Sequence, residues 1–274
     1  MADRYAVLQK LGDGQNAMLG VAAGGIEAAA TQPLTYAKNC FQQRTPLSLV
    51  PRVVYRGTPA SMAADGTLIG TQFACCGFLQ KRLLGGEARP LTAAEELGTA
   101  WLAGYASGVP CCVMELIMIQ QQKNGGTAAG AVARVLAARG PRGLLRGFTA
   151  SSFREGFFAC CYLGAAPRVQ RACDGLDLPP TAGAAVASTA SGVLCAAVTH
   201  PFDTIKTVAQ GDLGGAGFRG TTAAIYRDGG AAAFFRGFGA RGALICCCFF
   251  IFNETKLRLG AALWPDELRD ARAR

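Results

Sequence analysis

A proline, an acid and a base follow a long uncharged run, residues 181–198, in the stretch Thr199-His200-Pro201-Phe202-Asp203-Thr204-Ile205-Lys206. Because Pro201 removes one backbone donor and crowds the preceding turn, we expect it to bend a helix. Asp203 and Lys206 then share one helical face just beyond the bend. Charges at the end of a membrane-length apolar run are unfavourable unless they face partners or water. The stretch therefore predicts a bent membrane helix whose charged face lines a partner or a wet cavity.

The same pattern occurs twice more upstream. Its first copy is Pro33-Leu34-Thr35-Tyr36-Ala37-Lys38, and its second, degenerate copy is Val113-Met114-Glu115-Leu116-Ile117-Met118. Four residues after each base position stands a glutamine: Gln42, Gln122 and Gln210. Eleven residues before each acid position stands a glycine: Gly24, Gly104 and Gly192. These fixed offsets indicate an internal repeat, and small residues at such positions let helices approach closely in lipid.

A second motif recurs with a constant period. Three of the Arg-Gly dipeptides, Arg56-Gly57, Arg146-Gly147 and Arg236-Gly237, stand 90 residues apart, each after an aromatic residue or a leucine. We therefore interpret the chain as a single domain, 1–274, built from three repeats that cover approximately residues 13–85, 94–172 and 180–260.

Each repeat predicts two long helices, with short amphipathic segments between them. The long helices cover Ala17–Gln43, Thr58–Arg82, Leu97–Lys123, Thr149–Arg171, Thr181–Gln210 and Phe238–Arg258, and the short segments include Ala128–Arg139 and Thr221–Arg227. A helix of about 27 residues is about 40 Å long, enough to cross a bilayer with some tilt. The prediction is an all-α membrane protein with six transmembrane helices, bent at Pro33 and Pro201.

Composition supports a membrane protein that also encloses polar groups. Hydrophobic residues make up 51% of the chain and charged residues 16%. The basic residues behind the net charge of +9 are scattered over short connectors. They therefore fit anionic lipid headgroups better than nucleic acid, and no nucleic-acid partner is expected.

The cysteines and the single histidine argue against metal chemistry. The 12 cysteines stand mostly next to one another inside apolar runs, no Cys-x-x-Cys occurs, and His200 is the one histidine. This pattern disfavours a zinc site, and we expect neither a metal nor another cofactor. A soluble enzyme is also disfavoured, because a Ser-His-Asp arrangement would have to use His200 and no glycine-rich phosphate loop follows a predicted strand.

With three signatures and a fixed Arg-Gly period, nearly the whole chain resembles the mitochondrial carrier family of solute transporters. The resemblance implies six helices in pseudo-threefold symmetry around a water-filled cavity, in a monomer of the mitochondrial inner membrane. It also implies alternating-access transport or antiport of a small solute without covalent chemistry. The second copy departs from the family pattern, because Val113 stands for the proline and Met118 for the base.

The resemblance further implies a gate on the matrix side, in which the acid of one odd-numbered helix pairs with the base of the next. The pairs would be Glu115 with Lys206 and Asp203 with Lys38. The third pair, Thr35 with Met118, lacks both charges, which is milder than leaving one buried charge unpaired. Each ion pair would be worth up to about 4 kcal/mol before desolvation, at an effective dielectric constant of about 20. Three glutamines would brace the pairs by hydrogen bonds: Gln42, Gln122 and Gln210.

The family's second motif, aromatic-acid-x-x-base, is weak in this sequence. The candidates Phe78-Leu79-Gln80-Lys81-Arg82 and Phe252-Asn253-Glu254-Thr255-Lys256 both lack the acid at the second position, and the fourth long helix offers no clean copy. We therefore expect little closure on the intermembrane-space side. Alternatively, Lys81, Arg82 and Lys256 only anchor the helices in the headgroup layer.

In the family, backbone amides at the Arg-Gly turns bind cardiolipin. The resemblance therefore implies lipid sites at Arg56-Gly57, Arg146-Gly147 and Arg236-Gly237. Helix N-termini favour phosphate on general grounds, and the three arginines would reinforce the sites by their charge.

Family members contact their solute seven and eight residues beyond each turn glycine. These positions hold Ala64-Asp65, Arg154-Glu155 and Leu244-Ile245, with Arg241 three residues before Leu244. Asp65 and Glu155 would hold an amino group, while Arg154 or Arg241 would take a carboxylate. An arginine followed by an acid is similar to the family's amino-acid carriers, so the resemblance predicts an amino acid or a related zwitterionic or cationic solute. Alternatives are a keto-acid or carboxylate carrier, a carrier-like adaptor that no longer transports, and a merely self-neutralising Arg-Glu pair.

Overall fold

The computed structural model describes residues 13–85, 89, 91–174 and 179–265, and every regular element in these residues is a helix. The predicted all-helical class is therefore confirmed for this part of the chain. The ends of the predicted domain, 1–12 and 266–274, lie outside the described residues, as do parts of the two segments between the repeats.

Six long helical stretches coincide with the predicted ones. Five are single helices: α1 (Asp13–Gln43), α3 (Thr58–Leu84), α4 (Ala93–Asn124), α8 (Pro180–Gly211) and α10 (Phe238–Leu263). The sixth consists of α6 (Phe148–Ala159), a π-helical segment (Cys160–Ala165) and α7 (Ala166–Asp174). Pro33 and Pro201 lie inside α1 and α8 as expected, and Pro110 lies inside α4.

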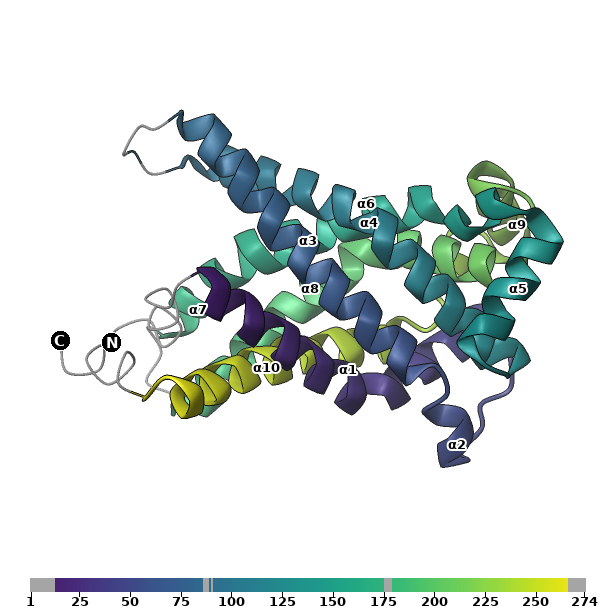
Figure 1. Cartoon of the computed structure of the whole chain (residues 1–274), viewed down its shortest axis with the longest axis horizontal. Coiled ribbons are helices and arrows are strands. Elements are labelled where there is room, and N and C mark those ends of the chain that lie inside the picture. Colours follow the sequence, from purple (N-terminus) through teal and green to yellow (C-terminus); the bar gives the residue numbers. More distant parts are fainter. Residues whose placement is uncertain (1–12, 86–88, 90, 175–178, 266–274) are drawn as a thin grey trace.

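Short helices gather at one end of the long ones, at the right of Figure 1. They are α2 (Pro51–Val54), α5 (Ala128–Arg139) and α9 (Phe218–Gly229), accompanied by 3₁₀ turns at Pro141–Leu145 and Ala231–Phe235. The predicted segment 128–139 matches α5, and the predicted segment 221–227 lies inside α9. The four residues of α2 are too few to show a helical period in the sequence.

The glycine of each Arg-Gly turn directly precedes the second long helix of its repeat. These second long helices, which start at α3, α6 and α10, are called even-numbered because they are the second, fourth and sixth long helices of the chain. Gly57, Gly147 and Gly237 precede α3, α6 and α10, with φ angles of +86°, +83° and +77°. Only glycine adopts this left-handed conformation without strain. A Cβ atom on each glycine would lie 3.1 Å from a side chain of the next repeat in cyclic order: Met118, Gln210 and Phe41. The third turn therefore packs against the first repeat.

Glycines on α1, α4 and α8 allow close packing within each repeat. A Cβ atom on Gly24 would lie 2.7 Å from Ile69 of α3, and one on Gly192 would lie 2.9 Å from the Cα atom of Cys246 on α10. On Gly104 it would collide with the carbonyl oxygen of Glu155 on α6. The glycines at these positions therefore leave room for the neighbouring helix to approach closely, as the sequence predicts.

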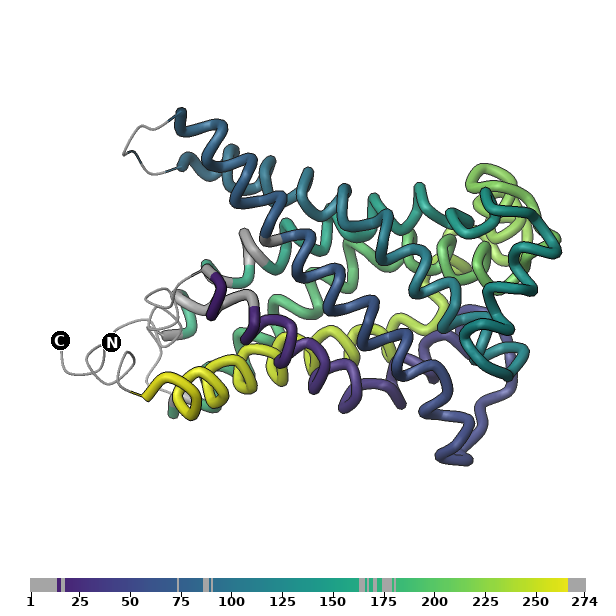
Figure 2. Tube along the Cα trace, viewed as in Figure 1, coloured from purple at the N-terminus to yellow at the C-terminus, as the bar shows by residue number. Residues whose placement is uncertain are grey.

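The long helices pack in a closed sequence of neighbours. Along the chain α1 contacts α3, α3 contacts α4, α4 contacts α6, α6 contacts α8 and α8 contacts α10. Figure 2 shows that α10 then lies beside α1, and the two helices are in contact. Core clusters fill the contacts between these helices, for example Cys161, Ala196 and Phe249 from three of the long stretches.

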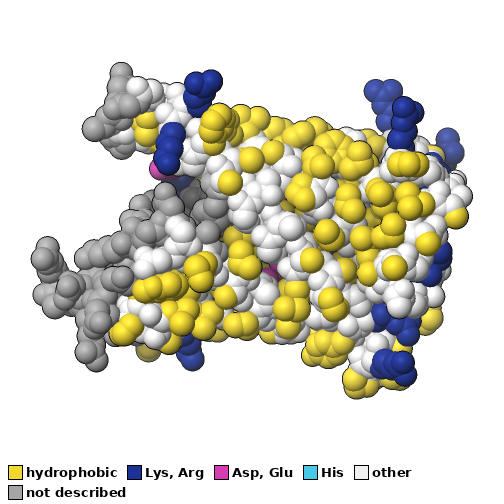
Figure 3. All heavy atoms as spheres, viewed as in Figure 1, with side chains coloured by type: hydrophobic (Ala, Val, Ile, Leu, Met, Phe, Trp, Pro, Cys, Tyr) yellow, Lys and Arg dark blue, Asp and Glu magenta, His cyan; other side chains and the backbone are white. Residues whose placement is uncertain are grey.

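Three helical stretches in the described residues are long and apolar enough to cross a membrane. They are Ala93–Asn124, Thr181–Gly211 and Ala231–Leu263. Figure 3 shows hydrophobic side chains over the middle of one face and Lys and Arg side chains gathered near its two ends. An apolar band between basic ends is typical of a protein in a bilayer with anionic headgroups.

Candidate functional site

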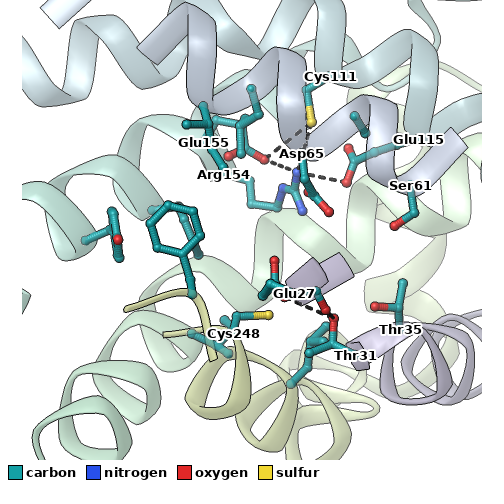
Figure 4. A pocket seen from close by; sticks show the side chains of 18 of the residues that line it. Glu27, Thr31, Thr35, Ser61, Asp65, Cys111, Glu115, Arg154, Glu155 and Cys248 are labelled. Carbon is teal, nitrogen blue, oxygen red and sulfur yellow. Dashed lines mark hydrogen bonds and ion pairs between the residues drawn. The ribbon is translucent and has the colours of Figure 1, made fainter. Parts of the chain in front are cut away.

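A cavity of about 150 Å³ lies among the long helices. Its charged lining residues come from α1, α3, α4, α6 and α10: Glu27, Lys38, Asp65, Glu115, Arg154, Glu155 and Arg241. Figure 4 shows how these helices point most of those side chains toward one another. The four predicted solute-binding residues, Asp65, Arg154, Glu155 and Arg241, therefore share one cavity.

Four predicted gate residues form a buried cluster beside this cavity. We call Lys38, Glu115, Asp203 and Lys206 the gate cluster. Lys38 Nζ lies 3.1 Å from Asp203 Oδ2, and Lys206 Nζ lies 2.7 Å from Glu115 Oε1. None of the four is more than 8% exposed. Both ion pairs implied by the family resemblance are therefore present in the structure.

Two arginines from the even-numbered helices join the gate cluster. Arg154 Nη2 lies 2.9 Å from Glu115 Oε1, and Arg154 Nη1 lies 3.3 Å from Asp203 Oδ1. Arg154 also contacts the neighbouring carboxylate of Glu155. Arg241 Nη1 lies 2.8 Å from Asp203 Oδ1. From the sequence, both arginines were expected to bind the solute, with a self-neutralising pair of Arg154 and Glu155 as the alternative, and their contact with the gate acids was not anticipated.

The third gate position carries no charge. Thr35 and Met118, the residues of the third predicted pair, both line the cavity. The corresponding residues at the other two contacts between repeats form ion pairs. Met118 packs against the first Arg-Gly turn, since a Cβ atom on Gly57 would lie 3.1 Å from its Cγ atom. At this contact between the first and second repeats the structure therefore shows packing in place of an ion pair.

One of the three glutamines braces a gate acid, which corrects the expectation for the other two. Gln42 Nε2 donates to Asp203 Oδ2 at 2.7 Å. Gln122 Oε1 accepts a hydrogen bond from Asn39 at 2.6 Å. Gln210 Nε2 donates to the backbone carbonyls of Cys112 and Arg146 at 3.1 and 3.2 Å. The hydrogen bonds of Gln210 thus hold the second Arg-Gly turn, where the backbone needs a donor.

The residue before each proline position contacts the Arg-Gly turn of its own repeat. Gln32 donates to the carbonyl of Arg56 at 3.5 Å, and the thiol of Cys112 donates to the carbonyl of Arg146 at 3.3 Å. His200 Nε2 lies 3.0 Å from the carbonyl of Arg236. All three side chains are fully buried. We call this contact the turn latch, and it accounts for the single histidine without metal chemistry.

Two cavity acids lack a basic partner. Glu27 and Asp65 form no ion pair in the described part of the chain, although Thr31 donates a hydrogen bond to Glu27 Oε1 at 3.0 Å. Glu27 is not among the residues predicted to bind the solute. Its signal was available, because Glu27 is the one charged residue in the apolar run 18–34.

Aromatic side chains line the cavity farther along the even-numbered helices. Fifteen residues beyond the turn glycines stand Gln72, Tyr162 and Phe252, and all three line the cavity. Tyr162 donates a hydrogen bond to Asn253 at 3.1 Å, and its ring centroid lies 5.8 Å from that of Phe252. Counting from the turn glycine would have located Tyr162, where the motif search found no clean copy.

The first candidate copy of the second motif, residues 78–82 of α3, lies on the surface and does not line the cavity. Phe78 is 63% exposed, and Lys81 and Arg82 are exposed as well. This corrects the placement of the motif on α3 and agrees with the alternative that Lys81 and Arg82 are surface anchors. Arg82 also lies 6.0 Å from the Phe78 ring centroid, so the two form a surface cation–π contact.

Two of the three arginines of the Arg-Gly turns, Arg146 and Arg236, are engaged by protein groups. Arg146 is 8% exposed and donates to the carbonyls of Ala209 and Ala216 at 2.5 and 3.2 Å. Arg236 Nη1 lies 2.5 Å from Asp228, which also pairs with Arg44 at 2.8 Å. The hydrogen bond from Arg236 holds the pKa of Asp228 below its ordinary value. These contacts change the expected charge reinforcement, because Arg146 has little surface to offer a lipid.

One group of cavity side chains has the composition of a metal site. Potential ligand atoms of Cys111, Glu115 and Glu155 lie within 4.8 Å of one another. The Arg154 guanidinium contacts all three side chains. A positive charge already compensates these acids, which disfavours a cation at the same place.

Comparisons with known proteins agree with this geometry. Residues 178–260, the third repeat, match a family model described as mitochondrial carrier protein. The chain is similar to mitochondrial citrate transporter B from Aspergillus niger, with 29% identity over 245 residues that cover 81% of this chain and 84% of the relative. This is a family of multi-pass transporters, typically of the mitochondrial inner membrane, and not of enzymes. The third-repeat match, the similarity along most of the chain and the threefold recurrence of the turns all point to similarity with the mitochondrial carrier family.

Proposed function

We propose that the protein exchanges a di- or tricarboxylate across the mitochondrial inner membrane. One observation carries the proposal. Each repeat contributes one basic side chain to the cavity: Lys38 from α1, Arg154 from α6 and Arg241 from α10. Three positive groups from three directions match a solute with several carboxylates. The relative named as a citrate transporter supports the same class.

The proposal includes the architecture of a carrier. A single domain would contain six transmembrane helices in three repeats, approximately 13–85, 94–172 and 180–260, in pseudo-threefold symmetry around a water-filled cavity. The cyclic contacts of the turn glycines and the contact of α10 with α1 support this arrangement. The gate cluster would close the cavity toward the matrix, the side on which α2, α5 and α9 lie.

The proposed cycle is alternating access. Solute would enter from the intermembrane space, because the gate cluster closes the other side. The free energy of solute binding would then offset the buried ion pairs of Glu115 and Asp203 and open the matrix side. Gln42 would contribute to the same barrier through its hydrogen bond to Asp203. If the empty carrier cannot change between the state open to the matrix and the state open to the intermembrane space, each solute molecule must be exchanged for another.

An amino acid is the second candidate, favoured by one specific observation. Glu27 and Asp65 line the cavity without an ion pair in the described residues, so they offer negative charge to an ammonium group. Glu155 contacts Arg154 and is less free for that role. The two candidates share the carboxylate and differ in the group that faces Glu27 and Asp65.

We extend the proposal to a monomeric carrier with bound cardiolipin. A second cavity, of about 350 Å³, lies at the second Arg-Gly turn and includes Gly147, Phe148, Gly217 and Phe218. It is formed at the starts of α6 and α9, where free backbone N–H groups favour phosphate. Because Arg146 is occupied by carbonyls, these backbone groups would make most of the contact.

The test combines binding and transport. Purified protein is heated with citrate, malate, glutamate or lysine, and the shift in Tm is measured. Uptake of labelled solute is then measured in proteoliposomes loaded with the same compound. We expect citrate or malate to stabilise the protein and to exchange, and Arg241→Gln to lower uptake about tenfold, the equivalent of about 1.4 kcal/mol. Arg52→Gln, at an exposed residue of α2, is the control.

The alternatives give different results. Stabilisation by glutamate or lysine but not by citrate would establish the second candidate. A well-folded protein that neither responds to any of these solutes nor exchanges them would contradict the proposal and favour the adaptor.

A further inference from the structure

The gate cluster contains two of the three ion pairs that three repeats could form with one another. The third repeat pairs with the second through Lys206 and Glu115, and with the first through Asp203 and Lys38. Between the first and second repeats stand Thr35 and Met118, which cannot form an ion pair. Two ionic edges and one neutral edge should leave the closed gate weaker on one side.

Arg154 supplies a contact that lies outside this pairing scheme. It reaches from α6 to Glu115 of α4 at 2.9 Å and to Asp203 of α8 at 3.3 Å. A guanidinium can bridge two carboxylates because its N–H groups form a planar fork, which a lysine ammonium cannot imitate. The Arg154 side chain is 12% exposed, so water screens these contacts only partly.

The same side chain faces the cavity. Arg154 lines it together with Thr35 and Met118, the two neutral gate residues. Its Nε atom is buried and has no hydrogen-bond partner in the described part of the chain. One donor of Arg154 is therefore unused while its Nη atoms contact Glu115, which Figure 4 shows close to Arg154, and Asp203.

We propose that Arg154 compensates for the missing third ion pair by adding an ionic contact between the second and third repeats, and that a solute carboxylate opens the gate by drawing Arg154 away from Glu115 and Asp203. The second half rests on the proposed function, whereas the first half is independent of the solute. Arg154 is thus a positioning residue for the gate as well as a solute ligand. A carrier with three gate ion pairs would not need such a bridge.

The experiment restores the missing pair and asks whether Arg154 becomes dispensable. Four proteins are compared with the wild type: Arg154→Gln, the pair Thr35→Asp with Met118→Lys, the combination of all three changes, and Arg154→Lys. Tm is measured for each purified protein without solute and again with citrate. Arg52→Gln is the matched control for loss of an exposed arginine.

Without solute, we expect Arg154→Gln to lower Tm by about 5 °C, the scale of a strong single-site effect in a chain of this size. The restored pair should recover at least half of that loss in the triple variant. Arg154→Lys should fall between wild type and Arg154→Gln, because a lysine keeps the charge but lacks the two Nη groups that reach Glu115 and Asp203 separately. With citrate, the triple variant should show at most a quarter of the wild-type Tm shift, because the solute ligand is still missing.

Two results would overturn the proposal. One is an unchanged solute-free Tm for Arg154→Gln, which would mean that Arg154 does not hold the gate. The other is a restored pair that raises the wild-type Tm but leaves the Arg154→Gln deficit unchanged, which would make the two contacts independent. If wild type ignores citrate while the solute-free series behaves as expected, the solute assignment fails and the gate role of Arg154 stands.

Discussion

The two ends of the cavity are lined by different chemistry. At the end near the Arg-Gly turns, fully buried Asp203 meets Lys38, Arg154 and Arg241 at 3.1, 3.3 and 2.8 Å. Farther along the even-numbered helices, the wall consists of Phe158, Tyr162, Phe249 and Phe252 in ring contact. A hydrogen bond from Tyr162 to Asn253 accompanies these rings.

The difference teaches how strongly each end resists opening. Removing one member of a buried charge cluster leaves the others uncompensated in a medium of low dielectric constant. Aromatic contacts contribute about 0.5–1.5 kcal/mol each beyond area burial and can be lost one at a time. The ionic end should therefore open in one cooperative step, and the aromatic end gradually.

The largest effect is expected at the ionic end. Asp203→Asn leaves four buried bases, Lys38, Arg154, Lys206 and Arg241, without their shared acid, so it should reduce stability by about 3–5 kcal/mol. Thermal unfolding of the purified protein measures this. Asp212→Asn, at an exposed residue just beyond α8, should change Tm little. Equal losses for both variants would remove the special role of the ionic end.

A helix contact between the two ends gives the next effect. A Cβ atom on Gly104 would lie 2.7 Å from that of Ala159, so Gly104→Ala should push α6 from α4 and cost about 1–3 kcal/mol. Gly98 lies on the same helix with nothing within 4 Å of such an atom. Gly98→Ala should instead stabilise the protein by about 0.5–1 kcal/mol. Changes in Tm of the same sign for both variants, relative to wild type, would contradict close packing at Gly104.

At the aromatic end we expect a smaller effect. Tyr162→Phe keeps the ring contacts and removes the hydrogen bond to Asn253, which should cost about 1 kcal/mol. Urea unfolding measures the loss. Asn253→Ala in the Tyr162→Phe background should add less than it does in wild type. Additive losses would show that the two side chains act separately.

The smallest effect belongs to an exposed ion pair outside the cavity. Because the folded-state pKa of Asp228 is lowered by Arg236, this contact stabilises the protein at neutral pH, and its contribution is lost as pH falls through that pKa. The Tm difference between wild type and Asp228→Asn should therefore shrink toward acid pH and at high salt. A difference that grows toward acid pH would reverse the assignment.

The sequence predicted the helices because their signals are local. The uncharged run before Pro201 and the positive-φ glycines after Arg56, Arg146 and Arg236 depend on neighbours within a turn or two. Repetition then made each signal count three times. The gate pairs followed from the family resemblance, since residues 165 apart, such as Lys38 and Asp203, share no local pattern.

The missed contacts are those in which one side chain serves two groups. Arg154 was assigned to the solute by its offset from Gly147, and its reach to Glu115 depends on the packing of α6 between α4 and α8. Gln210 was assigned to a gate pair by its offset from Lys206, but it donates to backbone carbonyls. Offsets along a helix give the face of a residue and not the partner across it.

The turn latch shows how a shape can be kept while its chemistry drifts. The carbonyl of Arg56, Arg146 or Arg236 precedes a left-handed glycine and therefore stands outside the helical ladder that would otherwise satisfy it. An amide, a thiol and an imidazole fill this need from the same place, one residue before the bend. The three repeats share a hydrogen-bond donor at the same position relative to the turn. Homologous segments can therefore keep the same hydrogen bond after their sequences have diverged.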